Sequence, residues 1–491
     1  MAKTVFFAAA FCASTGAMLL TGHVAVVALW IGLWAFALRA RTGTRGSGLL
    51  MFYVGFLLFY PAVLSVGTSV NEQAVIAACI LGLGLLTEWR AAKTRAGGWI
   101  RFLLVAWFVW GILAYAPVGL KWLMVTVLKA RGPDWLGDIF YETTALKTAG
   151  RTILAAASAL LAIRALRTPD DFRAFQRGLF VAACILVVLS AAESLTSVHL
   201  IPTGYEADAR RLAGFSMPDP NGYGRLLLLP TIFVTTFLLH QKARTPIWVW
   251  GLSLAAFASV ALTMSRTTYV SLSAGTLVLL ILNRARLRTI GVMAALAAAM
   301  AVVVLNSGLA DAFAEGSERR TLGSIYTRLG IYRSIGEILI ERPWFGMHPG
   351  GYLEGLALVG HRMPDQEFDY EKLHFETPHN MLLAVAVEYG IPMAAILVLT
   401  MATTVVVGLR TKRRIQSAGP APWRDDLDVC ANAAVALSVA YFVHGLTENG
   451  ILDAVFFTLG LAVASFAFVK RASSPPGSAG GRFAFGSRGE F

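Results

Sequence analysis

Long apolar stretches recur along almost the whole chain. Residues 289–305, for example, contain no charged side chain, and a helix of about 17–25 apolar residues is long enough to cross the hydrocarbon core of a membrane. Of the 491 residues, 56% are hydrophobic and only 14% are charged, and the mean hydropathy is +0.64. A soluble core of this size would not need so many apolar stretches. The sequence therefore predicts an all-α polytopic membrane protein.

Polar and charged residues divide the apolar stretches into spans. The predicted spans lie near 5–20, 22–38, 48–66, 72–87, 102–118, 149–165, 178–194, 223–240, 246–264, 267–283, 289–305, from His379 to Arg410, and near 428–446 and 450–469. Helices satisfy their own backbone hydrogen bonds in lipid, so spans of this length are expected to be helical. We expect about 12 to 14 transmembrane helices.

Lys and Arg gather in short clusters after every second span. The main clusters lie at 39–45, 90–101, 164–177, 242–244, 284–288, 410–414 and 470–471. Positive charge marks the cytoplasmic side of a membrane protein, so both termini are predicted to be cytoplasmic. The positive-inside rule and contact with anionic membrane lipids therefore account for the net charge of +13. A nucleic-acid partner is not predicted.

The pattern divides the chain into five parts. They are a transmembrane bundle (1–194), transmembrane helices with arginines at their outer ends (195–305), a large outer loop (306–378), C-terminal transmembrane helices (379–471) and a tail (472–491). Gly, Ser and Pro in the tail predict disorder. Residues 119–147 are expected to be interfacial, and the helical spacing of apolar residues in 324–340 predicts an amphipathic helix in the outer loop.

Several arginines fall on the predicted outer side, where the positive-inside rule disfavours them. They are Arg210, Arg211, Arg266 and Arg328, and each is expected to need an anionic partner. Two plainer interpretations remain open. Arg266 follows Ser265 between two spans and could extend to lipid headgroups. Arg211 precedes Asn221 in a segment rich in Gly and Pro that could be an ordinary capped loop.

His379 stands where the outer loop meets the next span. Pro378 suits the first turn of a helix and Thr377 suits its N-cap, so His379 is predicted in the first turn. The partial positive charge at a helix N-terminus disfavours imidazolium, which keeps the ring able to accept a proton. The pattern makes His379 a candidate general base, with a hydrogen-bonded surface histidine as the alternative.

A metal site at His374, Glu376 and His379 is the other interpretation of this segment. The spacing differs from the i, i+4 pair that places two ligands on one helix face, and Pro378 interrupts any helix across it. No metal is therefore predicted. The sequence also lacks a phosphate-binding glycine loop, so no nucleotide or other cofactor is expected.

Several short motifs in 200–395 together resemble the O-antigen ligase and polymerase superfamily of bacterial membrane glycosyltransferases. They are Arg211-Leu-Ala-Gly-Phe, Asp219-Pro-Asn-Gly, Ser265-Arg266, Arg328-Leu-Gly-Ile-Tyr, Pro343-Trp-Phe-Gly-Met-His-Pro-Gly, Pro378-His-Asn380 and Glu388-Tyr-Gly-Ile. Each motif is weak alone, whereas their order and shared outer placement make the set specific.

The resemblance implies a GT-C-like membrane fold in the bacterial inner membrane, with the active site at the periplasmic face. It implies transfer of a glycan from undecaprenyl pyrophosphate to a sugar hydroxyl, with inversion and without a metal. Arg211 and Arg266 would bind the pyrophosphate, together with Arg328. His379 would act as general base, and Asn380 and Asn221 would orient it or a sugar.

The acceptor separates two forms of this reaction. A ligase would pass the glycan to lipid A core, and a polymerase of O-antigen, capsule or exopolysaccharide would pass it to a growing glycan on its own carrier. Ligation is the prediction. A transporter of a lipid-linked sugar is a more remote alternative, because transporters carry polar groups near mid-bilayer in related halves, whereas here they concentrate at one face.

Overall fold

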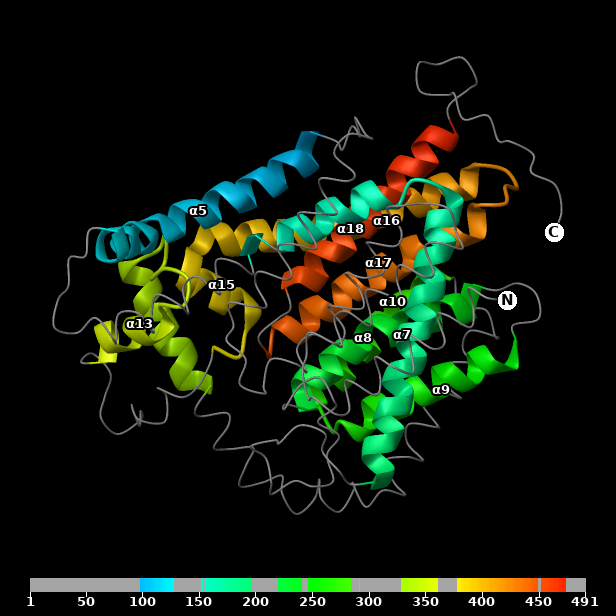
Figure 1. The fold of residues 1–491 in the computed structure, drawn as a ribbon, viewed down its shortest axis with the longest axis horizontal. Helices are drawn as coiled ribbons and strands as arrows, with labels where there is room; N and C mark the ends of the chain where they lie inside the picture. Colours follow the sequence, from blue (N-terminus) through cyan, green and yellow to red (C-terminus); the bar gives the residue numbers. More distant parts are fainter. Residues whose placement is uncertain are drawn as a thin grey trace.

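The computed structural model describes residues 98–127, 152–153, 155–196, 220–240, 246–283, 291, 328–360, 378–448 and 452–473. The helices are α5 (Gly98–Val127), α7 (Pro169–Thr196), α8 (Pro220–His240), α9 (Ile247–Leu262), α10 (Arg266–Leu282), α13 (Tyr352–Val359), α15 (Met381–Tyr389), α16 (Ile391–Ser417), α17 (Arg424–Gly445) and α18 (Leu452–Ala472). Two further helical segments are Ala155–Ala165 and 328–341. These ranges contain no strand, which confirms the all-α prediction (Figure 1).

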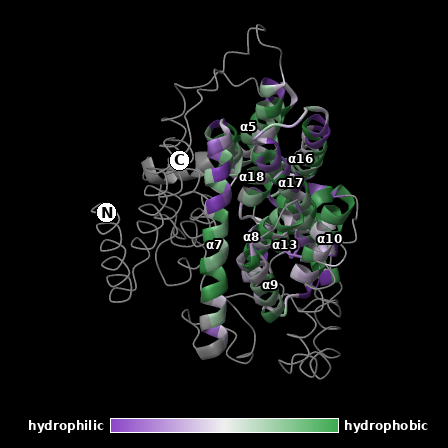
Figure 2. Ribbon diagram, turned by 90° about the vertical axis from the view of Figure 1, so that its right-hand side faces the viewer, coloured by the Kyte–Doolittle hydropathy of each residue, from purple (hydrophilic) through white to green (hydrophobic). Residues whose placement is uncertain are grey.

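Five helices within the described ranges are long and apolar enough to cross a membrane. They are Gly98–Ala116, Asn221–His240, Ile391–Ser417, Arg424–Gly445 and Ala454–Ala472. They confirm a polytopic membrane protein. Helix α7 is not one of these five; Figure 2 shows it hydrophobic along its middle and hydrophilic toward its upper end. The spans predicted before residue 98 and nearly all of the span at 289–305 lie outside the described residues.

Two helix boundaries differ from the prediction. Helix α5 continues without a break to Val127, so residues 119–127 of the predicted interfacial segment belong to this helix, and residues 128–147 lie outside the described residues. The crossing predicted from His379 to Arg410 begins later than expected, because α15 ends at Tyr389 and the candidate span α16 begins at Ile391. Gly390 separates them with a φ of +88°, a backbone conformation that residues with a Cβ rarely adopt. Only α16 is long enough to span.

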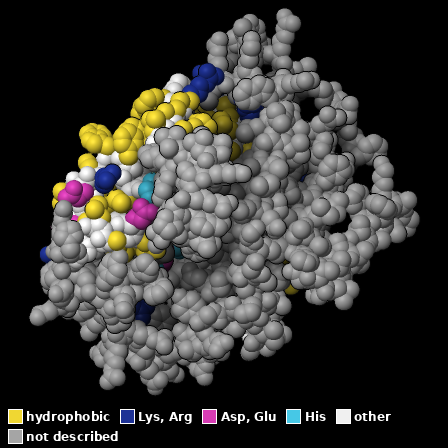
Figure 3. All heavy atoms as spheres, turned by 60° about the vertical axis from the view of Figure 1, so that its left-hand side comes forward, with side chains coloured by type: hydrophobic (Ala, Val, Ile, Leu, Met, Phe, Trp, Pro, Cys, Tyr) yellow, Lys and Arg dark blue, Asp and Glu magenta, His cyan; other side chains and the backbone are white. Residues whose placement is uncertain are grey.

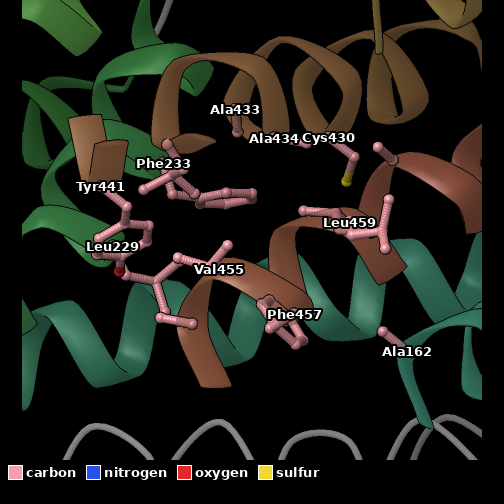
Figure 4. Packing of buried hydrophobic residues seen from close by; sticks show 14 of the residues in the cluster. Ala162, Leu229, Phe233, Cys430, Ala433, Ala434, Tyr441, Val455, Phe457 and Leu459 are labelled. Atoms are coloured by element: carbon pink, nitrogen blue, oxygen red, sulfur yellow. The ribbon is translucent and has the colours of Figure 1, made fainter. Parts of the chain in front are cut away.

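Helix α17 lies at the centre of the bundle. It packs against α8, α10, α16 and α18, which Figure 1 shows as the orange helix among its neighbours. Figure 4 shows how the interior is filled: Phe233 from α8, Tyr441 from α17 and Phe457 from α18 converge there. Because lipid tails are as apolar as these side chains, close packing rather than escape from water holds such helices together.

Small residues allow the helices to approach closely. A Cβ at Gly460 of α18 would come within 2.6 Å of the Ala159 carbonyl oxygen, and one at Gly275 of α10 within 3.1 Å of the Ala436 carbonyl oxygen. Such contacts between small residues are typical of helix pairs in membranes. The spacing of α10 against α17 matters for function because both helices end where the candidate site lies.

A second, smaller hydrophobic cluster joins the 328–341 helix to α13. Ile331, Ile335 and Ile338 are fully buried and pack with Tyr352 and Leu356. Their spacing of four and three residues places them on one helix face. The amphipathic helix predicted at 324–340 is thereby confirmed for its described part. In Figure 1 this cluster lies beside α15, at the left of the molecule.

Candidate functional site

Arg266 begins helix α10. The Ser265 side chain caps this helix by accepting a hydrogen bond from the Thr268 backbone N–H at 3.3 Å. Helix α9 ends only a few residues earlier, at Leu262, so the prediction of two helices joined by a very short turn is correct. The Arg266 side chain is exposed. Its charge therefore lies at a helix N-terminus, where backbone N–H groups also attract anions.

His379 lies just before a helix rather than inside its first turn. Asn380 is the N-cap of α15, and its Oδ1 accepts hydrogen bonds from the backbone N–H groups of Leu382 and Leu383 at 3.0 and 3.1 Å. The predicted cap at Thr377 with Pro378 in the first turn is therefore wrong. The Asn380 amide reaches the second and third N–H groups of the helix, as good caps do. His379 has a φ of +45°.

Glu448 joins three of the predicted site residues. Its Oε1 accepts hydrogen bonds from Asn221 Nδ2 at 3.1 Å and Arg328 Nη2 at 3.4 Å, and its Oε2 lies 3.4 Å from His379 Nδ1. The residue is only 8% exposed. A buried carboxylate needs such donors, because an unpaired charge away from water is costly. The three donors come from α8, the 328–341 helix and the residues before α15.

Arg266 belongs to the same end of the bundle. Thr447, next to Glu448, donates a hydrogen bond from Oγ1 to Thr267 Oγ1 at 3.1 Å, and Thr267 follows Arg266 in α10. We call this region, made of Asn221, Arg266, Arg328, His379 and Glu448, the His379 end. Arg210, Arg211, His374 and Glu376 lie outside the described residues.

Sequence reasoning missed Glu448. It stands in Thr447-Glu448-Asn449-Gly450, the short outer connection predicted between the last two spans. An acidic residue at such a place could have been noticed as a counter-ion for the outer arginines, since ionisable residues at the ends of spans usually have a partner. Nothing in the sequence says which of the many basic residues would lie within reach.

A glycine-rich turn at 342–351 supports α15 through backbone hydrogen bonds. The Met347 N–H donates to the Val387 carbonyl at 2.7 Å, and the Ile391 N–H donates to the Pro343 carbonyl at 2.9 Å. A Cβ at Gly390 would collide with the Trp344 carbonyl oxygen. These contacts join the motif that begins at Pro343 to the motif that contains Gly390, so the backbone of each motif holds the other in place.

Aromatic side chains from this turn lie at the surface. Trp344 is 66% exposed and Phe345 is 47% exposed, and the Phe345 ring stacks on Trp110 of α5 at 5.0 Å between centroids. Beside them His348 Nε2 lies 2.8 Å from Glu354 Oε2. Figure 3 turns this side of the molecule forward and shows a band of hydrophobic side chains with Asp, Glu and His side chains beside it.

The described part of the chain contains no group of three or more His, Cys, Asp or Glu side chains that could hold a metal ion. What the His379 end does contain is an imidazole against a carboxylate and two arginines. This arrangement can accept a proton from a hydroxyl group and can bind a doubly charged anion such as a phosphate.

Comparison with known proteins identifies one domain. Residues 251–399 match the family model described as O-Antigen ligase. The matched region runs from α9 through α10, the 328–341 helix, α13 and α15 into α16, and it includes Arg266, Arg328 and His379. A search of curated proteins finds no match to the chain.

Proposed function

We propose, from the membership of this chain in the O-antigen ligase and polymerase superfamily and from the contacts at the His379 end, that it is an O-antigen ligase. It transfers a glycan from undecaprenyl pyrophosphate to a sugar hydroxyl of lipid A core at the periplasmic face of the inner membrane. The pyrophosphate linkage of the donor supplies the free energy, so the reaction needs no nucleotide, and arginines rather than a metal neutralise the leaving pyrophosphate.

The donor binds through its pyrophosphate. Arg266 is exposed at the N-terminus of α10, where a guanidinium and the positive end of the helix dipole act together on phosphate oxygens. Arg211 and Arg328 contribute further positive charge. Neutralising the leaving pyrophosphate in a partly dehydrated site lowers the barrier to breaking the glycosidic bond.

His379 activates the acceptor. Its Nε2 takes the proton of the acceptor hydroxyl while the hydroxyl oxygen attacks the anomeric carbon of the donor sugar. The bond from that carbon to the phosphate oxygen breaks, and the electron pair leaves with undecaprenyl pyrophosphate. One displacement of this kind inverts the anomeric configuration, and general-base help contributes about 10²- to 10⁴-fold to the rate.

One observation carries the proposal. Residues that lie far apart in the sequence, at 221, 267, 328, 379 and 447–448, are joined by hydrogen bonds at one end of the helix bundle. A base and arginines at the end of apolar helices suit a substrate whose charged group lies at the membrane surface and whose tail lies in lipid. These contacts support an enzyme rather than a transporter.

The test is transfer by purified protein in detergent, with a polyprenyl pyrophosphate glycan as donor and lipid A core as acceptor. Arg266→Ala and His379→Ala are each expected to lose at least about 100-fold in rate. Arg333→Ala, which removes an exposed arginine elsewhere in the 328–341 helix, is the control. Transfer retained in both site variants would refute the assignment.

The product distinguishes the two members of the superfamily. Glycan on lipid A core identifies a ligase, and a longer glycan on the polyprenyl carrier identifies a polymerase. The same reaction with EDTA tests the metal: full activity is expected, and loss of activity that Mg²⁺ or Mn²⁺ restores would show a metal requirement.

A further inference from the structure

We propose that Glu448 is the positioning residue of this site: it fixes which nitrogen of His379 carries the proton and stabilises the imidazolium that forms during transfer. This inference rests on the proposed function, since it gives Glu448 a role in the step that His379 performs. The geometry that carries it is the contact of 3.4 Å between His379 Nδ1 and Glu448 Oε2.

The contact decides the tautomer of His379. A carboxylate can only accept a hydrogen bond, so Nδ1 must carry the proton that points at Glu448. In the neutral ring Nε2 is then the acceptor, and it is the nitrogen that takes the proton of the incoming hydroxyl. After that transfer the ring is positively charged and still faces the Glu448 carboxylate. The carboxylate therefore stabilises the charge that develops on the base.

A row of contacts holds the two residues in register. A Cβ at Gly445 would lie 2.7 Å from Met381 Cε, Asn380 Nδ2 donates to the Leu446 carbonyl at 2.9 Å, and His379 faces Glu448. Residues 379–381 at the start of α15 thus meet residues 445–448 at the end of α17 in antiparallel order. The Glu448 N–H also donates to the His444 carbonyl at 3.1 Å, which anchors its backbone. Proteins commonly orient a reactive histidine through a hydrogen bond to its other ring nitrogen and through the residues that hold that partner in place.

The other contacts of Glu448 indicate that it acts through His379 and does not contact the substrate itself. Asn221 and Arg328 occupy Oε1, and the side chain is 11% exposed. A carboxylate surrounded in this way has little access to a substrate hydroxyl, whereas His379 is 25% exposed. Among the charged groups of the His379 end, Glu448 contacts the His379 ring directly. Arg328 from the 328–341 helix binds the other oxygen of the same carboxylate, and Arg266 precedes Thr267, which is bonded to Thr447.

The experiment compares two variants that each remove one contact of the same carboxylate network. Glu448→Gln replaces the acceptor facing Nδ1 by an amide, which allows the other tautomer. We expect kcat to fall about 10²- to 10⁴-fold with a nearly unchanged KM for the donor. Asn221→Ala removes only a neutral donor, and we expect a loss of less than about tenfold.

The pH dependence of kcat/KM distinguishes two roles of Glu448: positioning His379 and only stabilising the fold. In Glu448→Gln the acidic limb of the kcat/KM profile is expected to move to lower pH, because the imidazolium form of His379 no longer faces a negative charge. The limb should stay in place in Asn221→Ala. Glu448→Asp keeps the charge, so it should keep the limb in place as well, at a reduced rate. Thermal unfolding of each variant in detergent checks that it is folded.

Each outcome has one meaning. Equal modest losses and identical pH profiles in Glu448→Gln and Asn221→Ala would show that Glu448 only holds the fold, and would overturn the inference. An inactive Glu448→Gln beside an active His379→Ala would make Glu448 the base. If His379→Ala loses transfer while Glu448→Gln behaves like the unchanged protein, the proposed function stands and only the positioning role fails.

Discussion

The two ends of the antiparallel pair α8 and α17 use similar side chains for different purposes. At the His379 end, Asn221 of α8 binds Glu448 after α17. At the opposite end, His240 of α8 lies 3.1 Å from Asp425 and 3.0 Å from Asp428 of α17. We call this second region, together with Arg173, Lys412 and Asp426, the Asp426 end. Both ends tie the same two helices together.

Charges are matched at the Asp426 end. Arg173 Nε donates to Asp426 Oδ2 at 2.7 Å, and Lys412 Nζ donates to Asn432 Oδ1 at 3.1 Å and to the Leu282 carbonyl. These contacts connect α7, α10, α16 and α17. Pairing between helices of groups that are partly removed from water resists unfolding, because removing either partner leaves a buried polar group unsatisfied.

Positive charge exceeds negative charge at the His379 end. Among the five residues that define this region, Glu448 is the acid, and it faces Arg328 and His379 with Arg266 nearby. An anion that binds to the folded protein here would stabilise it. The comparison therefore separates an end that holds the bundle together from the end at which we propose that an anionic substrate binds.

The largest effect is expected at Gly390. Gly390→Ala places a Cβ against the Trp344 carbonyl at a φ of +88°, and we expect a loss of more than about 3 kcal/mol in unfolding free energy together with loss of transfer. Gly336→Ala is the matched control, since its Cβ would meet nothing within 4 Å. Thermal unfolding in detergent measures both. An unchanged midpoint in Gly390→Ala would contradict the backbone contact.

The Asp426 end should affect stability and leave transfer intact. The Asp428 side chain is 13% exposed, whereas that of Asp425 is 65% exposed, although both bind His240. We expect Asp428→Ala to lower the unfolding free energy by about 2 to 3 kcal/mol and Asp425→Ala by less than about 1 kcal/mol. Transfer per folded molecule should not change. A tenfold loss of transfer in folded Asp428→Ala would contradict the prediction that the Asp426 end contributes to stability only.

Arg328 should affect binding more than folding. Its side chain is 32% exposed and lies 3.4 Å from Glu448, so Arg328→Ala should change stability by less than about 1 kcal/mol. If Arg328 also contacts the donor pyrophosphate, its removal should raise the donor KM about tenfold or more. Arg333→Ala on the same helix is the control. Equal KM values in the two variants would exclude Arg328 from donor binding.

The smallest effect on stability and transfer is expected for substitution of His444 of α17, one helical turn before Glu448. His444 is 1% exposed; within the described part of the chain its ring nitrogens have no side-chain partner at hydrogen-bond distance, and the backbone of Asn221 is a nearby polar group. Replacing an unsatisfied buried ring by an apolar side chain should be neutral or slightly stabilising, so His444→Leu should shift stability by about 0 to 1 kcal/mol without loss of transfer. A clear loss of transfer would extend the functional region to the α8–α17 interface beneath Asn221.

Local pattern was enough for the elements and for several site positions. Apolar length predicted the membrane helices, helical spacing predicted the face formed by Ile331, Ile335 and Ile338, and the Ser265-Arg266 pair predicted the start of α10. These features depend on residues within a few turns of one another. The cap of α10 confirms that Arg266 lies at the end of a helix, and its position on the outer side of the membrane stays a prediction.

Competition between neighbouring signals limited the prediction around His379. Thr377-Pro378 and Asn380 are both good helix starts by local rules. Asn380 is the cap in the structure, and its amide also donates to the Leu446 carbonyl. The N-cap Asn380 therefore has a hydrogen-bond partner, Leu446, that lies 66 residues away in the sequence. The local sequence around His379 contains no information about this partner.

Hydropathy and helix signals act over short distances, so the amino-acid sequence was sufficient to predict a polytopic helical membrane protein with Arg266 and His379 at the ends of helices. Only the tertiary structure decided that Glu448 stands among Asn221, Arg328 and His379. The close packing of α8, α10 and α17 sets which helix ends meet, and a buried carboxylate pairs with the donors that this packing brings within reach.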